Sequence, residues 1–380
     1  MKDKPLKIVY CTPALYMAGG VERVLTLKAN YFAEHFGYDV TIILTEGRDK
    51  PQFYPLSDKI KVINLDVGFE ELWTCSFLKK IFVYLKKQRI YKRRLTVELM
   101  RIRPDITISL LRREINFILD IKDGSKKVGE LHVNRANYRN FEANDTNFVK
   151  RIFERYWTNS LLSQLKRLDK FVVLTREDRN SWPELTNVKV IPDPLSFSPS
   201  SQSTLSKKRV IAVGRYVYQK GFDLLLQAWA EVEKKCTDWE LVIFGDGDRT
   251  SYEQLSAELA LQHCTLNGPT TDIEKEYLYS SLFVFSSRFE GFGMVLIEAM
   301  ACGLPVVSFA CPCGPRDIIS DGIDGLLVEN GNVHDLAEKL IHLIEHPAQR
   351  QCMGMKAVEK SEQYKLYRLA KDWQRLFESL

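Results

Sequence analysis

Residues 288–305 read RFEGFGMVLIEAMACGLP and follow the apolar stretch Leu282–Ser286. The apolar stretch predicts a buried strand, and the glycines after it predict a tight turn. The next run is apolar at nearly every position and ends at Gly303 before Pro305, which predicts a buried helix with a defined end. Strand, turn and helix in this order are typical of an α/β sheet whose ligands bind beyond the carboxyl ends of the strands.

Two carboxylates lie in this segment, and Glu298 follows Glu290 by slightly over two helical turns on the same face. The open amides of residues 291–294 could surround a ligand while Glu290 accepts hydrogen bonds from hydroxyl groups. A carboxylate pair is also typical of glycosidases. The same half of the chain, however, carries Arg215 and Lys220, which suit phosphate and which hydrolysis of a neutral glycoside does not need. We therefore expect a ligand with both hydroxyl groups and a diphosphate.

The second half of the chain repeats strand, turn and helix around this segment. Arg215 and Lys220 lie on the loop GRYVYQKG, residues 214–221, after the first strand of this half. Arginine can bind phosphate oxygens in a bidentate manner and lysine adds a point charge, so the loop suits a diphosphate. The apolar runs that predict strands here are Val210–Val213, Glu240–Phe244, Leu282–Ser286 and Val306–Ser308, with a helix at Phe222–Lys235.

The first half shows the same alternation. A strand at Lys7–Cys11, a loop at Pro13–Gly20 and a helix at Val21–Phe36 open the chain. The amides of Gly19 and Gly20 could bind an anion, or the glycines could serve only a tight turn; the loop is neither G-x-G-x-x-G nor a P-loop. The further predicted strands are Val40–Leu44, Ile106–Leu110, Lys127–Leu131 and Phe171–Leu174. The predicted fold class is α/β, with two Rossmann-like, doubly wound parallel-sheet domains that face a cleft.

Length and composition agree with two domains. The chain has 380 residues, of which 45% are hydrophobic and 27% charged, so it can bury two cores. The Ser-rich stretch 196–208 predicts a linker, which gives domains at 1–195 and 196–363, with a last helix at about 364–380 that packs back on the first domain. Eight scattered cysteines, no export leader and no run of 18 apolar residues predict a cytoplasmic protein.

Charge is distributed unequally. Residues 1–195 hold 35 Lys and Arg against 24 Asp and Glu, whereas residues 196–380 hold 19 against 25. The segment Lys79–Arg103 has ten basic residues and one acidic residue, and its spacing predicts a basic amphipathic helix. Such a helix could lie on an anionic membrane, or it could pack on the core with a solvated charged face. We expect no nucleic-acid partner, because no stacking-aromatic or zinc module accompanies the charge. The apolar positions of this helix are Leu78, Ile81, Phe82, Leu85, Tyr91, Leu95, Leu99 and Ile102.

Together these segments resemble the GT-B-fold retaining glycosyltransferases of family 4, in the branch that makes bacterial polysaccharides and lipid-linked saccharides. The resemblance covers nearly the whole chain. Its motifs are GGVERV at 19–24, VGR and KGF within 213–222, GDG at 245–247, the pair Glu290 and Glu298, and DGIDGLLV at 321–328.

The resemblance implies a role for each matching position. Arg215 and Lys220 would hold the donor diphosphate, and the amides of Gly19 and Gly20 would close over it from the first domain. Glu298 would bind the ribose hydroxyls. His132 matches the family's histidine at the tip of a first-domain strand, near the acceptor and the reacting sugar, and a purely structural histidine is the alternative. The donor sugar's hydroxyls and its distal phosphate would be bound by Glu290 and the amides of Gly291, Phe292, Gly293 and Met294.

The resemblance also implies the reaction. A hexose or N-acetylhexosamine would move, with retention, from a nucleotide diphosphate, with UDP favoured, to a saccharide or lipid-linked saccharide acceptor in the synthesis of a cell-surface polysaccharide, lipopolysaccharide or capsule. Fixed cations and amides would take the place of a metal, so we expect no cofactor. Two alternatives remain: a GT-B-like sugar-nucleotide epimerase, and a two-domain protein that binds its ligand without chemistry.

Overall fold

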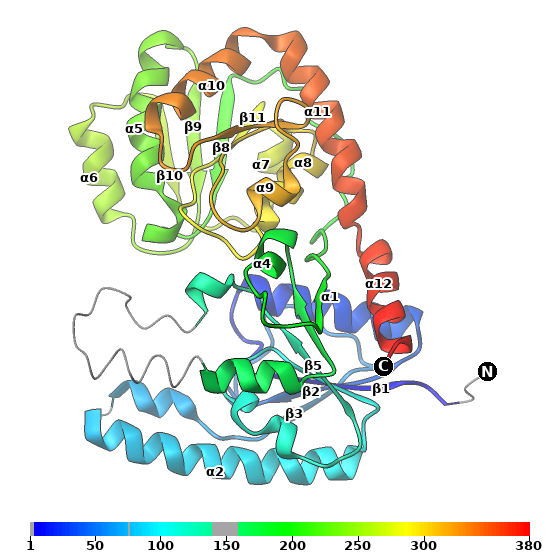
Figure 1. Cartoon of the computed structure of the whole chain (residues 1–380). Coiled ribbons are helices and arrows are strands. Elements are labelled where there is room, and N and C mark those ends of the chain that lie inside the picture. Colours follow the sequence, from blue (N-terminus) through cyan, green and yellow to red (C-terminus); the bar gives the residue numbers. More distant parts are fainter. Residues whose placement is uncertain (1–3, 75–76, 139–158) are drawn as a thin grey trace. The chain divides into compact units, whose positions relative to one another are not determined.

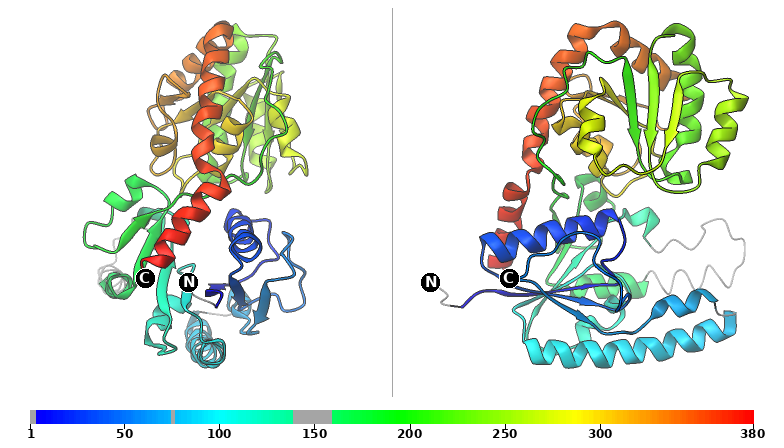
Figure 2. Two further views of the ribbon diagram at one scale, coloured as in Figure 1. Left: turned by 90° about the vertical axis from the view of Figure 1, so that its right-hand side faces the viewer. Right: turned by 180° about the vertical axis from the view of Figure 1, so that it is seen from behind.

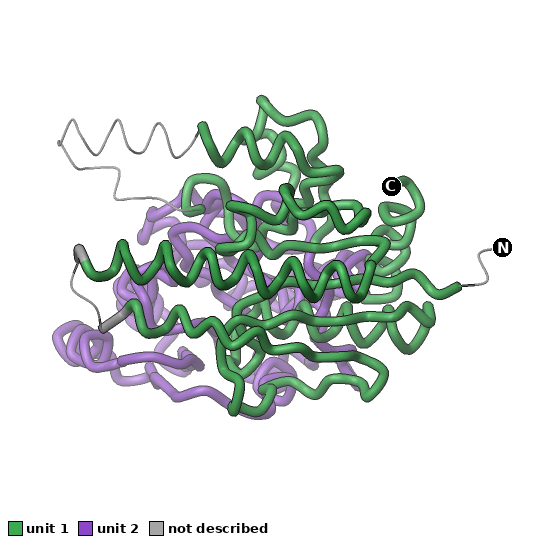
Figure 3. The backbone as a smooth tube through the Cα atoms, turned by 90° about the horizontal axis from the view of Figure 1, so that it is seen from below, with its two compact units in different colours: residues 1–192, 366–380 green, residues 193–365 purple. Residues whose placement is uncertain are grey.

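The computed structural model describes residues 4–74, 77–138 and 159–380. The chain divides into two compact units (Figure 3). The first comprises Met1–Pro192 together with Leu366–Leu380, and the second comprises Asp193–Lys365. Within the described residues, no helix combines the length and the hydropathy that a membrane span requires.

The first unit is built on a seven-stranded parallel sheet with the order β3-β2-β1-β4-β5-β6-β7. Strand β1 pairs with both β2 and β4, so that Ile8 lies beside Val40 on one side and Ile106 on the other. Long apolar runs such as the one in β2 suit a parallel sheet that is buried on both faces. The strands are β1 (Lys7–Thr12), β2 (Asp39–Leu44), β3 (Lys61–Asn64), β4 (Ile106–Ser109), β5 (Lys126–Glu130), β6 (Lys170–Val173) and β7 (Val188–Val190).

Helices cover both faces of this sheet (Figures 1 and 2). Alternate residues of β1 show the division: Ile8 and Tyr10 pack with α1 and α12, whereas Val9 and Cys11 pack with α2. The C-terminal helix α12 thus completes the core of the first unit, and its Phe377 meets Phe32 of α1 edge to face. The helices are α1 (Gly20–His35), α2 (Phe77–Ile102), α4 (Arg176–Asn180) and α12 (Leu366–Glu378), with residues 159–167 also helical and short 3-10 turns η1 (Phe69–Thr74), η2 (Glu114–Asn116), η3 (Ile118–Asp120) and η4 (Arg135–Asn137).

The second unit holds a six-stranded parallel sheet with the order β10-β9-β8-β11-β12-β13. Its strands are β8 (Arg209–Val213), β9 (Glu240–Phe244), β10 (Cys264–Asn267), β11 (Leu282–Phe285), β12 (Val306–Phe309) and β13 (Gly325–Val328). Helices α5 and α10 pack on the face that carries Val210 and Ala212. The helices are α5 (Phe222–Lys235), α6 (Thr250–Glu258), α7 (Ile273–Leu278), α8 (Met294–Ala301), α9 (Pro315–Ile318), α10 (Val333–Glu345) and α11 (Pro347–Ser361), with 3-10 turns η5 (Tyr218–Lys220) and η6 (Glu362–Tyr364).

The predicted fold class is confirmed, since both units are α/β with entirely parallel sheets. The apolar positions of α2, however, divide into two groups. Tyr91, Leu95 and Leu99 are buried in the core of the first unit, whereas Ile81, Phe82 and Leu85 are exposed. Val83 and Tyr84 also pack against this core, so α2 is packed along much of its length and leaves an exposed apolar group near its start.

Candidate functional site

In the second unit the predicted donor residues gather at the carboxyl ends of β8 and β11. Arg215 is exposed, one residue beyond Gly214, and has no ion-pair partner among the residues that the structure describes. Two glycines bring their backbones close together here. A Cβ on Gly245, which follows β9, would lie 1.8 Å from the carbonyl oxygen of Gly214. Only glycine at this position allows the ends of the two strands to approach so closely. A ligand at this edge would face Arg215 and exposed backbone.

Lys220 and Glu290, which are 70 residues apart in the sequence, form an ion pair. Lys220 Nζ lies 2.6 Å from Glu290 Oε1, and both side chains are mostly buried. Gln219 Nε2 donates to the carbonyl oxygen of Phe289 at 3.0 Å and lies 3.4 Å from Glu290 Oε2. The structure therefore brings the predicted phosphate cation and the predicted sugar carboxylate together as one neutral pair.

A set of open amides follows Glu290. Within the described residues, the amides of 291–294 donate no hydrogen bond to another backbone group. Gly293 has a φ of 97°, a value that favours glycine, and it begins helix α8 at Met294. The Phe292 ring is buried against Tyr364, so this residue offers its backbone and not its side chain. The free amides at this helix start can thus donate hydrogen bonds to an anion or to hydroxyl oxygens.

Glu298 lies on α8 and is buried. Its carboxylate accepts a hydrogen bond from Ser196 Oγ, and Tyr277 Oη lies 3.4 Å from Glu298 Oε2. Ser196 is near the start of the second unit, so the carboxylate also connects the linker region to the sheet. For Glu298 to bind ribose hydroxyls, as the resemblance implies, the ligand would have to replace or join these partners.

Arg288 is a residue of this edge that the sequence did not single out. Its guanidinium forms a bidentate pair with Asp223, at 2.8 and 2.6 Å, and donates to the carbonyl oxygen of Tyr218 at 2.8 Å. The guanidinium also lies over the Tyr218 ring. Burial raises the pKa of Asp223, but hydrogen bonds from Arg288 outweigh this effect and lower it. Arg288 therefore anchors the loop that carries Arg215 and Lys220, and its position two residues before Glu290 was the available signal.

In the first unit the glycine loop lies at the carboxyl end of β1 and leads into α1. Gly19 caps this helix with extended backbone, and its carbonyl accepts the amide of Arg23 at 3.1 Å. A Cβ on Gly19 would lie 2.0 Å from Glu22 Oε2. An acidic side chain in the first turn therefore faces Gly19, and a larger residue at this position would have to displace that carboxylate. Gly20, the first residue of the helix, is exposed.

His132 follows β5 and is nearly buried. Its Nε2 lies 3.1 Å from Glu130 Oε1, and Lys28 of α1 donates to the same carboxylate. The Lys28 and Glu130 side chains are 3% and 1% exposed, so this is a buried ion pair in direct contact with the predicted catalytic histidine. Lys28 Nζ also lies over the ring of Trp373 of α12, 4.5 Å from its centroid, in a cation–π contact.

The charges of this cluster depend on one another. Burial by itself raises the pKa of Glu130, but the positive charges of Lys28 and His132 outweigh it and lower that pKa to about 2. Burial, together with the charge of Glu130, raises the pKa of Tyr10 well above its usual range. Glu130 is therefore an ionised group buried inside the first unit.

Sequence reasoning missed Lys28 and Glu130, although signals existed. Lys28 lies midway between Val24 and Phe32, on the buried face of α1, where a charge is unexpected. Glu130 is two residues before His132, which places the two side chains on the same side of an extended chain. The described residues thus form one cluster in each unit: His132 with Glu130 and Lys28 in the first, and the set around Lys220 and Glu290 in the second.

Comparison with known proteins gives consistent results. The family model for glycosyl transferases group 1 matches residues 196–360. An uncharacterized glycosyltransferase of Haemophilus influenzae is 30% identical over 94% of this chain and 95% of its own length. The amylovoran biosynthesis glycosyltransferase AmsD of Erwinia amylovora is 26% identical over 97% of this chain and 98% of its own.

A solved structure has the same fold. A crystal structure of TarM from S. aureus, a complex that contains UDP, superposes with a TM-score of 0.76 at 18% identity and covers 98% of this chain and 99% of TarM. Its likeness shows the fold, and the relative from H. influenzae shows the family. The chain therefore belongs to the group 1 glycosyltransferases and has the GT-B fold.

Proposed function

We propose that this enzyme is a retaining glycosyltransferase of family 4 type, which moves a hexose or N-acetylhexosamine from UDP to a saccharide or lipid-linked saccharide. The observation that carries the proposal is the edge of the second unit, where an exposed arginine, a lysine–glutamate pair and open amides lie together. The UDP in the TarM complex and the polysaccharide role in the name of AmsD support it. An epimerase and a binding protein are the alternatives that the experiments below test.

In this proposal Arg215 makes the first contact with the donor diphosphate, because its charge is not yet compensated. Lys220 joins it, and Glu290 binds the sugar hydroxyls together with the amides of residues 291–294. Negative charge develops on the leaving phosphate in the transition state, so cations and amide dipoles fixed at that point stabilise it most. Glu298 would hold the ribose.

In the first unit, His132 would lie near the acceptor and the reacting sugar. Glu130 would orient its ring, and Lys28 would keep Glu130 ionised. Gly19 and Gly20 would add open amides for the phosphates. By resemblance, the leaving phosphate oxygen takes the proton of the acceptor hydroxyl, and the acceptor attacks from the face that the phosphate leaves.

We propose that no metal is needed, because the cations and amides can themselves balance the diphosphate. We also place the enzyme in the cytoplasm, at the inner face of the membrane, where a lipid-linked acceptor is available. The exposed apolar residues at the start of α2, surrounded by lysines, support this location.

The experiment that tests the function is a binding and turnover panel with UDP, GDP, ADP and their sugars. We expect UDP to raise the melting temperature most, and slow release of free sugar from one UDP-sugar. Conversion of that UDP-sugar into an isomer would support the epimerase, and binding without any release or transfer would support the binding protein.

A matched pair of variants tests the donor site. Arg215→Ala should weaken UDP binding about tenfold or more, the usual effect of losing a charge-assisted hydrogen bond. Lys234→Ala removes an exposed cation from the last turn of α5, at the opposite edge of the sheet, and should leave binding unchanged. Equal effects of the two variants would contradict a specific phosphate site at Arg215.

A further inference from the structure

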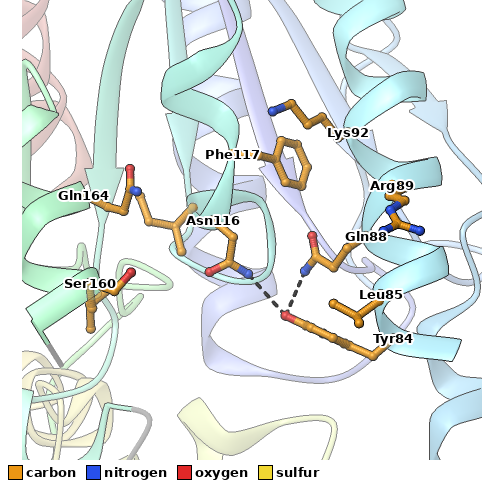
Figure 4. A pocket seen from close by; sticks show the side chains of 11 residues that line it. Tyr84, Leu85, Gln88, Arg89, Lys92, Asn116, Phe117, Ser160 and Gln164 are labelled. Atoms are coloured by element: carbon orange, nitrogen blue, oxygen red, sulfur yellow. Dashed lines mark hydrogen bonds between the residues drawn. The ribbon is translucent and has the colours of Figure 1, made fainter. Parts of the chain in front are cut away.

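The described residues of the first unit line a pocket of about 430 Å³ between α2, the turn that begins at Glu114, and the helical residues 159–167 (Figure 4). This volume is within the usual range of small-molecule sites, about 300–1,000 Å³. Ile115, Phe117 and Leu161 contribute apolar lining, and all three belong to the buried core. An occupant of this pocket would therefore need an apolar part.

The pocket also contains an incompletely used polar group. Tyr84 Oη accepts hydrogen bonds from Gln88 Nε2 at 2.9 Å and from Asn116 Nδ2 at 3.2 Å (Figure 4). With two donors directed at this oxygen, the hydroxyl proton has no acceptor among the described residues. Gln88 Oε1 is buried and has no hydrogen-bond partner there either. An occupant with oxygen atoms could satisfy the hydroxyl proton of Tyr84.

Two cations line the same pocket. Arg89 and Lys92 are both exposed residues of α2. Lys92 Nζ is 3.4 Å from Asp120, which Arg167 also contacts, and Arg89 has no ion-pair partner within the described part of the chain. Among the lining residues that the structure describes, none carries a carboxylate. The charge therefore favours an anion over a neutral or cationic occupant.

The pocket continues into an apolar patch at the start of α2. Leu85 lines the pocket, and Ile81 and Phe82 lie one turn before it. Phe82 is 76% exposed, which is unusual for a phenylalanine on a long helix. Lys79, Lys80 and Lys86 are exposed around this patch. Apolar residues within a basic surface are typical of helices that contact anionic lipid, because the cations near the surface attract the lipid headgroups.

We propose that this pocket binds the hydrocarbon chain of an anionic lipid and that Arg89 and Lys92 hold the phosphate at its end. The apolar lining, the unused hydroxyl proton and the two cations each match one part of such a molecule. The inference rests on the proposed function, in which the acceptor is lipid-linked. It assigns the hydrocarbon chain and the phosphate of a membrane lipid or lipid-linked acceptor to this pocket of the first unit. Both sources share one chemistry, a long chain that ends in a phosphate.

The test measures binding directly and does not require sugar transfer. Decyl phosphate should bind the full-length protein. Inorganic phosphate, which lacks the hydrocarbon chain, and decyl maltoside, which lacks the phosphate, should each bind at least about tenfold more weakly. Ser160→Trp places an indole in the pocket from an exposed position and should weaken decyl phosphate binding at least about tenfold. Ser163→Trp, also exposed on the same helix and outside the pocket lining, is the control and should bind as the parent does.

A second pair examines the charge. Arg89→Gln should weaken decyl phosphate binding about tenfold, and Arg93→Gln, one turn further along α2 and outside the pocket lining, should not. Competition by undecaprenyl phosphate or by phosphatidylglycerol vesicles then distinguishes the acceptor lipid from bulk lipid.

Equal binding of inorganic and decyl phosphate, or equal effects of Ser160→Trp and Ser163→Trp, would overturn the proposal. Release of sugar from UDP-sugars is measured separately on the same variants and should not change. If the parent protein releases sugar but does not bind decyl phosphate, the pocket proposal alone fails. If it binds decyl phosphate but releases no sugar, the proposed function alone fails.

Discussion

Replacing Lys28 by methionine tests whether the buried ion pair serves the histidine or only the fold. The change keeps most of the side-chain volume and removes the charge, so Glu130 is left buried beside His132 without its lysine. Breaking one partner of a buried pair costs about 3–5 kcal/mol, and the interaction with Trp373 is lost as well. We expect the free energy of unfolding in urea to fall by that amount.

A second buried ion pair, which also has one residue on β5, provides the control. Lys127 Nζ lies 2.5 Å from Asp123 Oδ1, with side chains 8% and 1% exposed, and Lys127 precedes His132 by five residues along the chain. Lys127→Met should therefore lose a similar amount of stability. Only Lys28→Met should also lower kcat for transfer at a temperature where both proteins are folded, by about a hundredfold, the size expected when a reacting group is displaced by about 1 Å.

Two further observations make the comparison decisive. Lys28→Arg restores the charge, so it should recover part of kcat if the lysine acts through Glu130. KM for the donor should change little in Lys28→Met, because the residues assigned to donor binding in the second unit are intact. Equal loss of kcat in Lys28→Met and Lys127→Met would refute a positioning role, since the effect would then follow stability alone.

Three other changes have defined outcomes. Glu130→Gln should lower the free energy of unfolding at neutral pH. The difference from the parent should narrow by about 2 kcal/mol between pH 5 and pH 3, because the pKa of Glu130 in the folded protein is lowered to about 2, so its ionised form stabilises the fold above the ordinary carboxyl pKa and this contribution is lost on acidification. Acid titrations of both proteins followed by circular dichroism measure the difference. Lys220→Met and Glu290→Gln should each weaken UDP-sugar binding, but the double variant should lose less than their sum, and additive losses in calorimetry would show that the two act independently. EDTA should leave transfer unchanged in a chromatographic assay, whereas complete loss with recovery on adding magnesium would contradict metal independence.

The fold could be predicted because its signals are local. Apolar runs such as Leu282–Ser286 define strands, and Gly303 before Pro305 ends a helix, so the α/β class follows from short stretches. Three edge strands, β3, β7 and β10, were not predicted, because their residues are partly exposed and alternate less clearly. β13 is mostly buried, but it is a run of only four residues, and its sequence was singled out as a motif and not as a strand.

The candidate site was predictable only where one motif contains it. Glu290 and the amides after it come from a single segment. The ion pair of Lys28 and Glu130 joins residues 102 positions apart, and no local pattern specifies such a partner. The exposure of Phe82 was hidden for a related reason: periodicity shows that a residue lies on the apolar face of a helix, but only tertiary packing decides whether that face is covered.

The pair between Lys220 and Glu290 links two motifs that the sequence presents as separate. Lys220 Nζ is paired with Glu290 at 2.6 Å, so under the proposed function the exposed Arg215 would be the cation that an incoming diphosphate meets first. If a phosphate then attracts Lys220, the Glu290 carboxylate loses its partner and gains the capacity to accept hydrogen bonds from the sugar. Nucleotide and sugar would in this way be recognised together, because a buried carboxylate without a cation costs several kcal/mol and the sugar hydroxyls repay part of that cost. A nucleotide without its sugar would leave Glu290 uncompensated, so the intact donor should open the pair more readily than UDP alone.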